Sequence, residues 1–128
     1  MFQSLDFLYT PAIDVDAEVA YLVDVVGATL EWRVRAMATT VACLRVCDDG
    51  PRVLLAGHLG GSAPVAVYRV ADYAATVAAL RAKGVRPREL EIPPGPCAIL
   101  ETPAGQRLGV YQLVRPEAAE HFAGRFDP

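Results

Sequence analysis

The sequence contains no apolar run that approaches the roughly 20 residues of a membrane-spanning helix. Its first residues, MFQSLDFLYT, lack the basic and then apolar pattern of a secretory signal. The basic residues are scattered and the net charge is -3, so the concentrated positive field that nucleic acid requires is missing. These absences predict a cytoplasmic protein with neither a membrane nor a nucleic-acid partner.

Cysteine is scarce, with three residues in the chain. Cys43 and Cys47 lie four positions apart in a predicted strand, which places their Cα atoms about 13 Å apart at roughly 3.3 Å per residue. A disulfide needs about 5.5 Å, so this pair cannot form one within the strand. We therefore expect Cys43, Cys47 and Cys97 to be small buried side chains in a reducing compartment, and no spacing resembles a zinc site.

The residues that are present suit a well-packed core, because 53% are hydrophobic and 21% are charged. In the first half, Asp14 and Asp16 can cap a helix whose apolar stripe runs from Val15 to Val26, and Gly27 can end it. Strands are predicted on both sides of this helix by β-branched and alternating residues. Their expected ranges are 7–13, 30–35, 39–46 and 52–58.

The same order of elements is predicted again after a short glycine linker. Asp72 can cap a helix that carries Tyr73, Val77 and Leu80 on one face, and Gly84 can end it. Strands are expected at 65–70, 88–92, 97–101 and 108–114. The sequence thus predicts a single α+β domain of two βαβββ modules, about 5–58 and 63–115, with a linker at 59–62 and a helical segment at 116–128.

The run from Asp14 to Gly27, its echo from Asp72 to Gly84, and the turn Thr102–Gln106 resemble the vicinal-oxygen-chelate superfamily. That superfamily includes glyoxalase I, extradiol dioxygenases, fosfomycin-resistance proteins and bleomycin-binding proteins. The resemblance covers roughly residues 5–115 and implies curved, partly barrel-like mixed sheets around a cavity. It also implies a homodimer, although two modules in one chain could close such a sheet without a second copy.

The resemblance further implies one divalent metal held by His and Glu side chains on the edge strands. The matching positions lie seven residues before each capping aspartate and four residues after each turn glycine. Here these positions hold Phe7, Leu54, Val65 and Gly109. Because none of them offers an N, O or S donor, we expect no metal and no cofactor.

Because side chains alternate across a strand, residues two positions away from these four sites should face the same side of the sheet. The residues then predicted to line a cavity are Phe7, Tyr9, Leu54, His58, Val65, Val67, Arg69, Arg107 and Tyr111. The opposite face should pack beneath the helices through Leu8, Val53, Leu55, Tyr68, Val70, Leu108 and Val110. Alternation with Leu30 and Val34 favours a helix-facing Trp32, and a ligand-facing Trp32 remains the alternative.

Two functions fit this set of residues. The first is metal-free binding of an aromatic or anionic metabolite or antibiotic, because tyrosines can stack on rings and Arg69 or Arg107 can pair with an anion. The second is a metal-independent isomerase, lyase or cyclase acting on a carbonyl compound, with His58 as the proton-transfer group or else a surface histidine. A glyoxalase- or dioxygenase-like metalloenzyme is the least favoured alternative.

Overall fold

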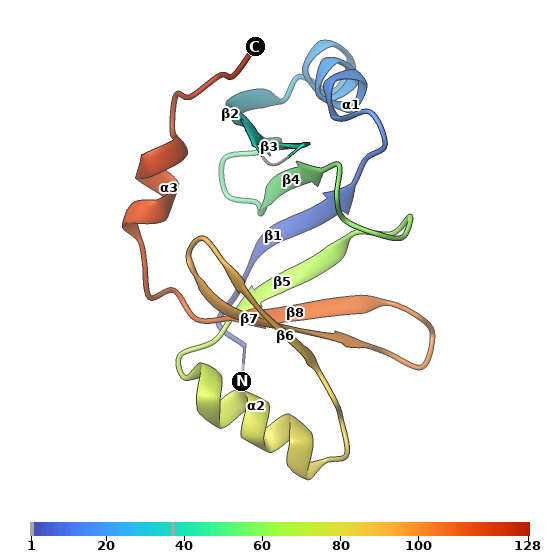
Figure 1. Ribbon diagram of the computed structural model, residues 1–128, viewed down its shortest axis with the longest axis vertical. Helices are drawn as coiled ribbons and strands as arrows, with labels where there is room; N and C mark the ends of the chain where they lie inside the picture. Colours follow the sequence, from blue (N-terminus) through green and yellow to red (C-terminus); the bar gives the residue numbers. More distant parts are fainter. Residues whose placement is uncertain (1, 37) are drawn as a thin grey trace. The chain divides into compact units, whose positions relative to one another are not determined.

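The computed structural model describes residues 2–36 and 38–128, and its elements follow the order βαβββ twice (Figure 1). The first set comprises β1 (Ser4–Pro11), α1 (Val15–Tyr21), a π-helical turn (Leu22–Val26), β2 (Thr29–Ala36), β3 (Thr39–Arg45) and β4 (Arg52–Ala56). The second comprises β5 (Val65–Arg69), α2 (Tyr73–Ala82), β6 (Arg88–Ile92), β7 (Gly95–Glu101) and β8 (Arg107–Tyr111), and α3 (Glu117–Phe122) follows. The predicted α+β class and the repeated order of elements are confirmed.

Contacts within the chain divide it into two units, and each unit includes a short segment from one end of the chain. Phe7–Pro64 and Phe122–Pro128 form one unit, which we call module one. Val65–His121, with the residues before Phe7, forms the other, which we call module two. The end of the chain therefore belongs with the first repeat and its beginning with the second, which the sequence pattern did not indicate.

Module one has the strand order β2-β3-β4-β1, in which β1 runs parallel to β4. The carboxylate of Asp14 accepts a hydrogen bond from the Ala17 amide at 3.0 Å, so it caps α1 as predicted. Val15 and Val19 of α1 pack on the sheet, in a core that includes Leu44 and Leu55. Burial of this apolar face is what holds the helix on the sheet.

A β-bulge in β2 changes the orientation of Trp32. Leu30 pairs with Leu44, whose side chain is in the core beneath α1, but Trp32 pairs with Cys43 on the other face. The shift in register between Leu30 and Trp32 breaks the regular alternation that favoured a helix-facing indole. The expectation drawn from alternation was wrong here, and Trp32 faces away from α1.

Module two repeats the arrangement, with strand order β5-β8-β7-β6 and with β5 parallel to β8. Asp72 caps α2 by accepting a hydrogen bond from Ala75 at 3.0 Å. Beneath α2 the core contains Val70, Val77 and Val110. The helix-facing positions predicted by alternation are confirmed for Val70 and Val110 in this module, and for Val53 and Leu55 in module one.

Two local predictions are corrected. Cys47 is exposed, because β3 ends at Arg45 and the chain then turns away, whereas Cys43 and Cys97 are buried as expected. The strand expected from Cys97 already begins at Gly95, where a Cβ atom would lie 1.9 Å from the carbonyl oxygen of Gln112. Only glycine allows that close approach of the two backbones. Among the residues described, none of the helices has the length and apolar character to cross a membrane.

Candidate functional site

The four positions at which the superfamily would hold a metal lie on the sheet faces opposite the helices. Phe7 and Leu54 are half-buried in module one, and Val65 and Gly109 are buried in module two. A Cβ atom at Gly109 would lie 3.2 Å from Cγ2 of Val67, so a ligating side chain has no space there unless Val67 moves. Within residues 2–36 and 38–128, no three His, Cys, Asp or Glu side chains gather as a metal site would require. The donors present therefore do not fit the metal.

Several side chains on the face of module two opposite α2 are almost fully buried. Val65, Val67 and Tyr111 were predicted to line a cavity, but they are exposed by 1%, 3% and 1%. Cys97 pairs with Tyr111 across β7 and β8, and burial raises the pKa of its thiol to about 11. Such a thiol is protonated near neutral pH and is a weak nucleophile. This face is organised as a core.

A carboxylate, a guanidinium and a phenol meet at one end of that face. Arg69 Nε donates to Asp6 Oδ2 at 2.8 Å, and the Tyr111 hydroxyl donates to the same oxygen. Burial raises the pKa of Asp6, and hydrogen bonds from Ser4, Tyr111 and Arg69 lower it. Together the hydrogen bonds outweigh burial, so the pKa of Asp6 lies below its usual 3.8. Burial and the bond to Asp6 raise the pKa of Tyr111. Asp6 thus stays ionised and holds Arg69 and Tyr111 together.

The structure does not bring the two predicted anion-binding arginines together. Arg69 pairs in register with Tyr111, whereas Arg107 pairs with Val65 at the other end of β5. Four residues of strand separate the two positions, or about 13 Å. The two side chains therefore leave the strands at opposite ends of the β5–β8 pair.

The face of module one opposite α1 carries the half-buried aromatic side chains. Tyr9, Leu54, Cys43 and Trp32 form a row across β1, β4, β3 and β2, and Phe7 lies beside it on β1. Phe7, Tyr9, Leu54 and Trp32 all retain partial exposure. We call this the aromatic face. Four predicted ligand-binding residues therefore share one partly open surface of a single module.

Two arginines beside the aromatic face share one carboxylate. Arg52 Nε donates to Glu31 Oε1 at 2.6 Å, and Arg45 Nε lies 3.7 Å from Glu31 Oε2. Arg45 also pairs with Asp48, whose side chain is 87% exposed and therefore strongly screened by water. Burial and the nearby Glu31 raise the pKa of Cys43 to about 12, so its thiol is not a reactive group. Two guanidinium groups and two carboxylates therefore lie together beside the aromatic face.

His58 is exposed after the end of β4 and links two hydroxyl groups. Its Nε2 lies 3.1 Å from the Tyr9 hydroxyl, and its Nδ1 lies 3.1 Å from Oγ1 of Thr39. One nitrogen of a neutral imidazole donates and the other accepts, so protons can pass between the two hydroxyls through the ring. The sequence had singled out His58 and Tyr9 but not their hydrogen bond, and it had not indicated Thr39.

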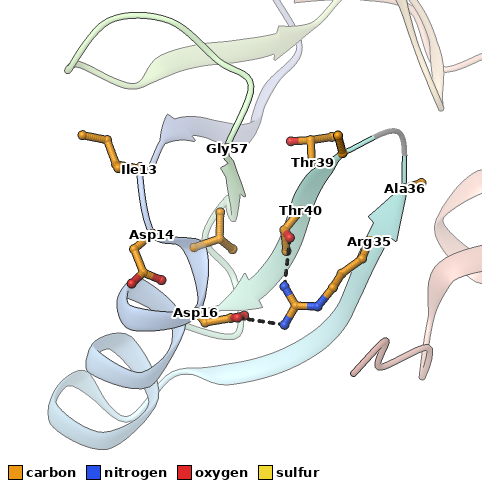
Figure 2. Close-up of a pocket in the computed structure, with 10 residues that line it drawn as sticks. Ile13, Asp14, Asp16, Arg35, Ala36, Thr39, Thr40 and Gly57 are labelled. Atoms are coloured by element: carbon orange, nitrogen blue, oxygen red, sulfur yellow. Dashed lines mark hydrogen bonds and ion pairs between the residues drawn. The ribbon is translucent and has the colours of Figure 1, made fainter.

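An open groove of about 870 Å³ lies at the end of module one where Thr39 and Gly57 sit (Figure 2). Figure 2 shows Arg35 between Asp16 and Thr40, with a dashed line to each. Arg35 Nη2 donates to Asp16 Oδ2 at 2.8 Å, and Arg35 Nη1 donates to Thr40 Oγ1 at 2.9 Å. Asp14, also in the groove, caps α1. The charged groups of the groove thus hold α1 to β2 and β3, and none of them was predicted as a site residue.

Comparison with known proteins identifies the fold. No family model matches the sequence, and no curated protein sequence does. Among solved structures, methylmalonyl-CoA epimerase from Mycobacterium tuberculosis superposes with a TM-score of 0.73 and 18% identity, over 92% of this chain and 93% of that one.

Two further solved structures share the fold. A glyoxalase/bleomycin resistance protein/dioxygenase superfamily member from Vibrio splendidus 12B01 has a TM-score of 0.59 and 18% identity, over 88% of this chain and 98% of that one. A catechol 2,3-dioxygenase has a TM-score of 0.64 and 16% identity, over 87% of this chain and 41% of that one. At such low identity, the likeness establishes the architecture of the chain and no activity.

Proposed function

From the vicinal-oxygen-chelate fold of this chain, we propose that it is a metal-independent protein that binds a small aromatic anion on the aromatic face of module one. The main observation in support is that Phe7, Tyr9 and Trp32 are partly exposed on one face. Leu54, which is apolar, occupies a position where a metal ligand is expected. Partly open aromatic walls favour a flat ligand, because ring stacking adds to the free energy of apolar burial.

The preference for an anion is supported by the charges beside these rings. Arg45 and Arg52 both pair with the half-buried carboxylate of Glu31, and Arg45 also pairs with the exposed carboxylate of Asp48. A planar guanidinium can donate to a ligand carboxylate or sulfonate while one of its nitrogens stays bound to Glu31. We therefore expect anionic aromatic compounds to bind more tightly than their neutral analogues.

The test combines metal analysis with a defined probe. Purified protein is incubated with Mn²⁺, Co²⁺, Ni²⁺ or Zn²⁺, freed of unbound metal, and analysed for metal content and by native mass spectrometry. Binding of anilinonaphthalene sulfonate is then measured for the wild type, for Arg52→Met, and for Arg88→Met, an exposed arginine on β6 in module two that serves as a control. We expect metal well below one equivalent per chain, and weaker probe binding in Arg52→Met alone.

Either of two results would overturn this proposal. Stoichiometric metal that survives desalting would contradict the metal-independent part. Equal probe affinity in the wild type and Arg52→Met would show that Arg52 does not recognise the anion. A small molecule retained in the native mass spectrum would identify the ligand class directly.

A second candidate function, metal-independent proton transfer on a carbonyl compound, is favoured by the contacts of His58. The imidazole touches Tyr9, a member of the aromatic face, and Thr39, which lines the groove. A base within hydrogen-bond reach of two hydroxyls can remove and return a proton next to a carbonyl. Exchange of the α-protons of pyruvate in D₂O, followed by NMR, tests this function. Exchange in the wild type that is lost in His58→Ala supports it, and equal rates with and without protein reject it for this substrate.

A further inference from the structure

The last residues of the chain, Phe122–Pro128, run along β2, the edge strand of module one. The Arg33 amide donates to the Arg125 carbonyl at 2.8 Å, and the Asp127 amide donates to the Arg33 carbonyl at 2.9 Å. Upstream, the Gly124 amide donates to the Glu31 carbonyl at 3.2 Å. The segment, which we call the tail, thus pairs with β2 in parallel around Arg33 and Phe126.

Asp127 is the main polar anchor of the tail. Its Oδ2 accepts from the Arg35 amide at 2.8 Å and from Arg125 Nη2 at 2.9 Å, and its Oδ1 accepts from Arg125 Nε at 2.9 Å. Its backbone carbonyl accepts from Arg33 Nε at 3.0 Å. Hydrogen bonds from Arg125 and from the Arg35 backbone lower the pKa of Asp127 to about 2, so the anchor is ionised at any physiological pH.

The anchor is joined to the rest of module one through Arg35. The same guanidinium that binds Asp16 and Thr40 (Figure 2) also donates from Nε to the Pro128 carbonyl at 2.6 Å. Helix α1, strand β3 and the tail are therefore held by one arginine. An arginine with several partners is restricted in rotamer, which fixes the position of the tail relative to β2.

The other end of the tail reaches the aromatic face. The ring of Phe122 lies against the indole of Trp32, with centroids 5.1 Å apart and planes inclined by 38°. Trp32 belongs to the aromatic face because of the bulge in β2. We infer that the tail completes the ligand-binding face, with Phe122 as a further binding residue and Asp127 as the positioning residue that holds Phe122 against Trp32. This inference rests on the proposed binding of an aromatic anion by module one.

A purely structural alternative is that the tail only covers the edge of β2, since an unpaired edge strand invites association with other chains. The two roles differ in what they predict for Trp32. If the tail only protects the edge, the loss of Asp127 would change stability and aggregation and leave probe affinity unchanged. If the tail completes the aromatic face, probe affinity must fall as well.

The experiment uses the full chain and its single tryptophan, Trp32. Emission and acrylamide quenching of Trp32, and affinity for anilinonaphthalene sulfonate, are measured for the wild type, Phe122→Ala, Asp127→Ala and Asp127→Asn. Glu120→Gln is the matched control, because it removes one negative charge from exposed α3. Far-ultraviolet circular dichroism verifies that each variant is folded.

We expect Phe122→Ala and Asp127→Ala to expose the indole, which shifts emission to the red and increases quenching, and to weaken the probe by about 2- to 12-fold, the range expected for one aromatic pair. Asp127→Asn should recover part of both effects, because its amide oxygen can still accept from the Arg35 amide. Glu120→Gln should match the wild type.

Three outcomes would overturn the inference. Wild-type emission in Asp127→Ala would show that Asp127 does not position Phe122. Altered emission with unchanged probe affinity would limit the tail to covering the edge. A wild type that binds no probe would contradict the proposed function and the ligand part of this inference together, while the emission of the variants would still decide whether Asp127 acts on Trp32.

Discussion

The two modules share one topology but use the sheet face opposite the helix in different ways. In module two that face is built from Val65, Val67 and Tyr111, which are almost fully buried. In module one the equivalent face carries Tyr9 and Trp32, which stay half-exposed. A repeated βαβββ scaffold therefore does not impose one role on both of its faces. The side chains decide whether such a face becomes a core or a surface open to a ligand.

The difference has identifiable local causes. The valine side chains of Val65 and Val67 on β5 lie close to Gly109, so a side chain at that position would displace them. In module one, the bulge in β2 places Trp32 on the face opposite α1, whereas regular alternation would have placed it on the helix-facing side. The comparison predicts that the same substitution has unequal effects in the two modules, and the following experiments test that inequality.

The largest effect is expected from placing a histidine at one of the expected metal-ligand positions in each module. Val65→His should lower the free energy of unfolding by about 3 kcal/mol, because a buried polar ring replaces a close-packed valine without a hydrogen-bond partner. Leu54→His, in half-buried surroundings, should cost less than about 1 kcal/mol. Urea denaturation of both variants measures the difference. Equal losses would mean that the two faces are packed alike.

The next effect concerns the phenol of module two. Tyr111→Phe keeps the buried ring but removes the hydroxyl that donates to the carboxylate of Asp6. A hydrogen bond to a charged group contributes about 2 kcal/mol, and we expect a loss of that order from the free energy of unfolding. Denaturation at pH 7 measures it. A change below about 0.5 kcal/mol would show that Arg69 alone is sufficient to hold Asp6.

Much of this comparison could be predicted from local sequence signals. Asp14 and Asp72 are caps at the expected positions, since capping depends on residues only a few positions apart. Alternation also placed Val53 and Val110 beneath the helices. Both signals are carried by neighbouring residues, and they determined the order of elements and most of the register.

The remaining features depend on contacts between distant residues. A bulge inserts one residue into a strand and leaves no clear mark in the pattern, so Trp32 was expected on the wrong face. Asp6 was missed because β1 was expected to begin at residue 7, and its partners Arg69 and Tyr111 lie far along the chain. Phe122 was expected in the helical segment at 116–128, and nothing near it in sequence indicates a contact with Trp32.

A pH dependence should follow from the lowered pKa of Asp6. Because the folded pKa lies below the unfolded value of 3.8, the ionised carboxylate stabilises the folded protein above that pH. This contribution is lost as the pH falls through 3.8 towards the folded pKa. The difference in the free energy of unfolding between the wild type and Asp6→Asn should therefore decrease as the pH falls from about 5 to about 2. A constant difference over this range would show that Asp6 acts through shape rather than charge.

The smallest effect is expected in module one. Tyr9→Phe removes a hydroxyl that lies 3.1 Å from His58 Nε2, and both the hydroxyl and the imidazole are accessible to water, which can replace the lost hydrogen bond. The free energy of unfolding should change by less than about 0.5 kcal/mol, in contrast to Tyr111→Phe. The NMR chemical shifts of the His58 ring protons should nevertheless change, because one of its two hydroxyl partners is gone. A large loss of stability with unchanged ring-proton shifts of His58 would mean that Tyr9 is part of a core, and the difference between the two modules would then disappear.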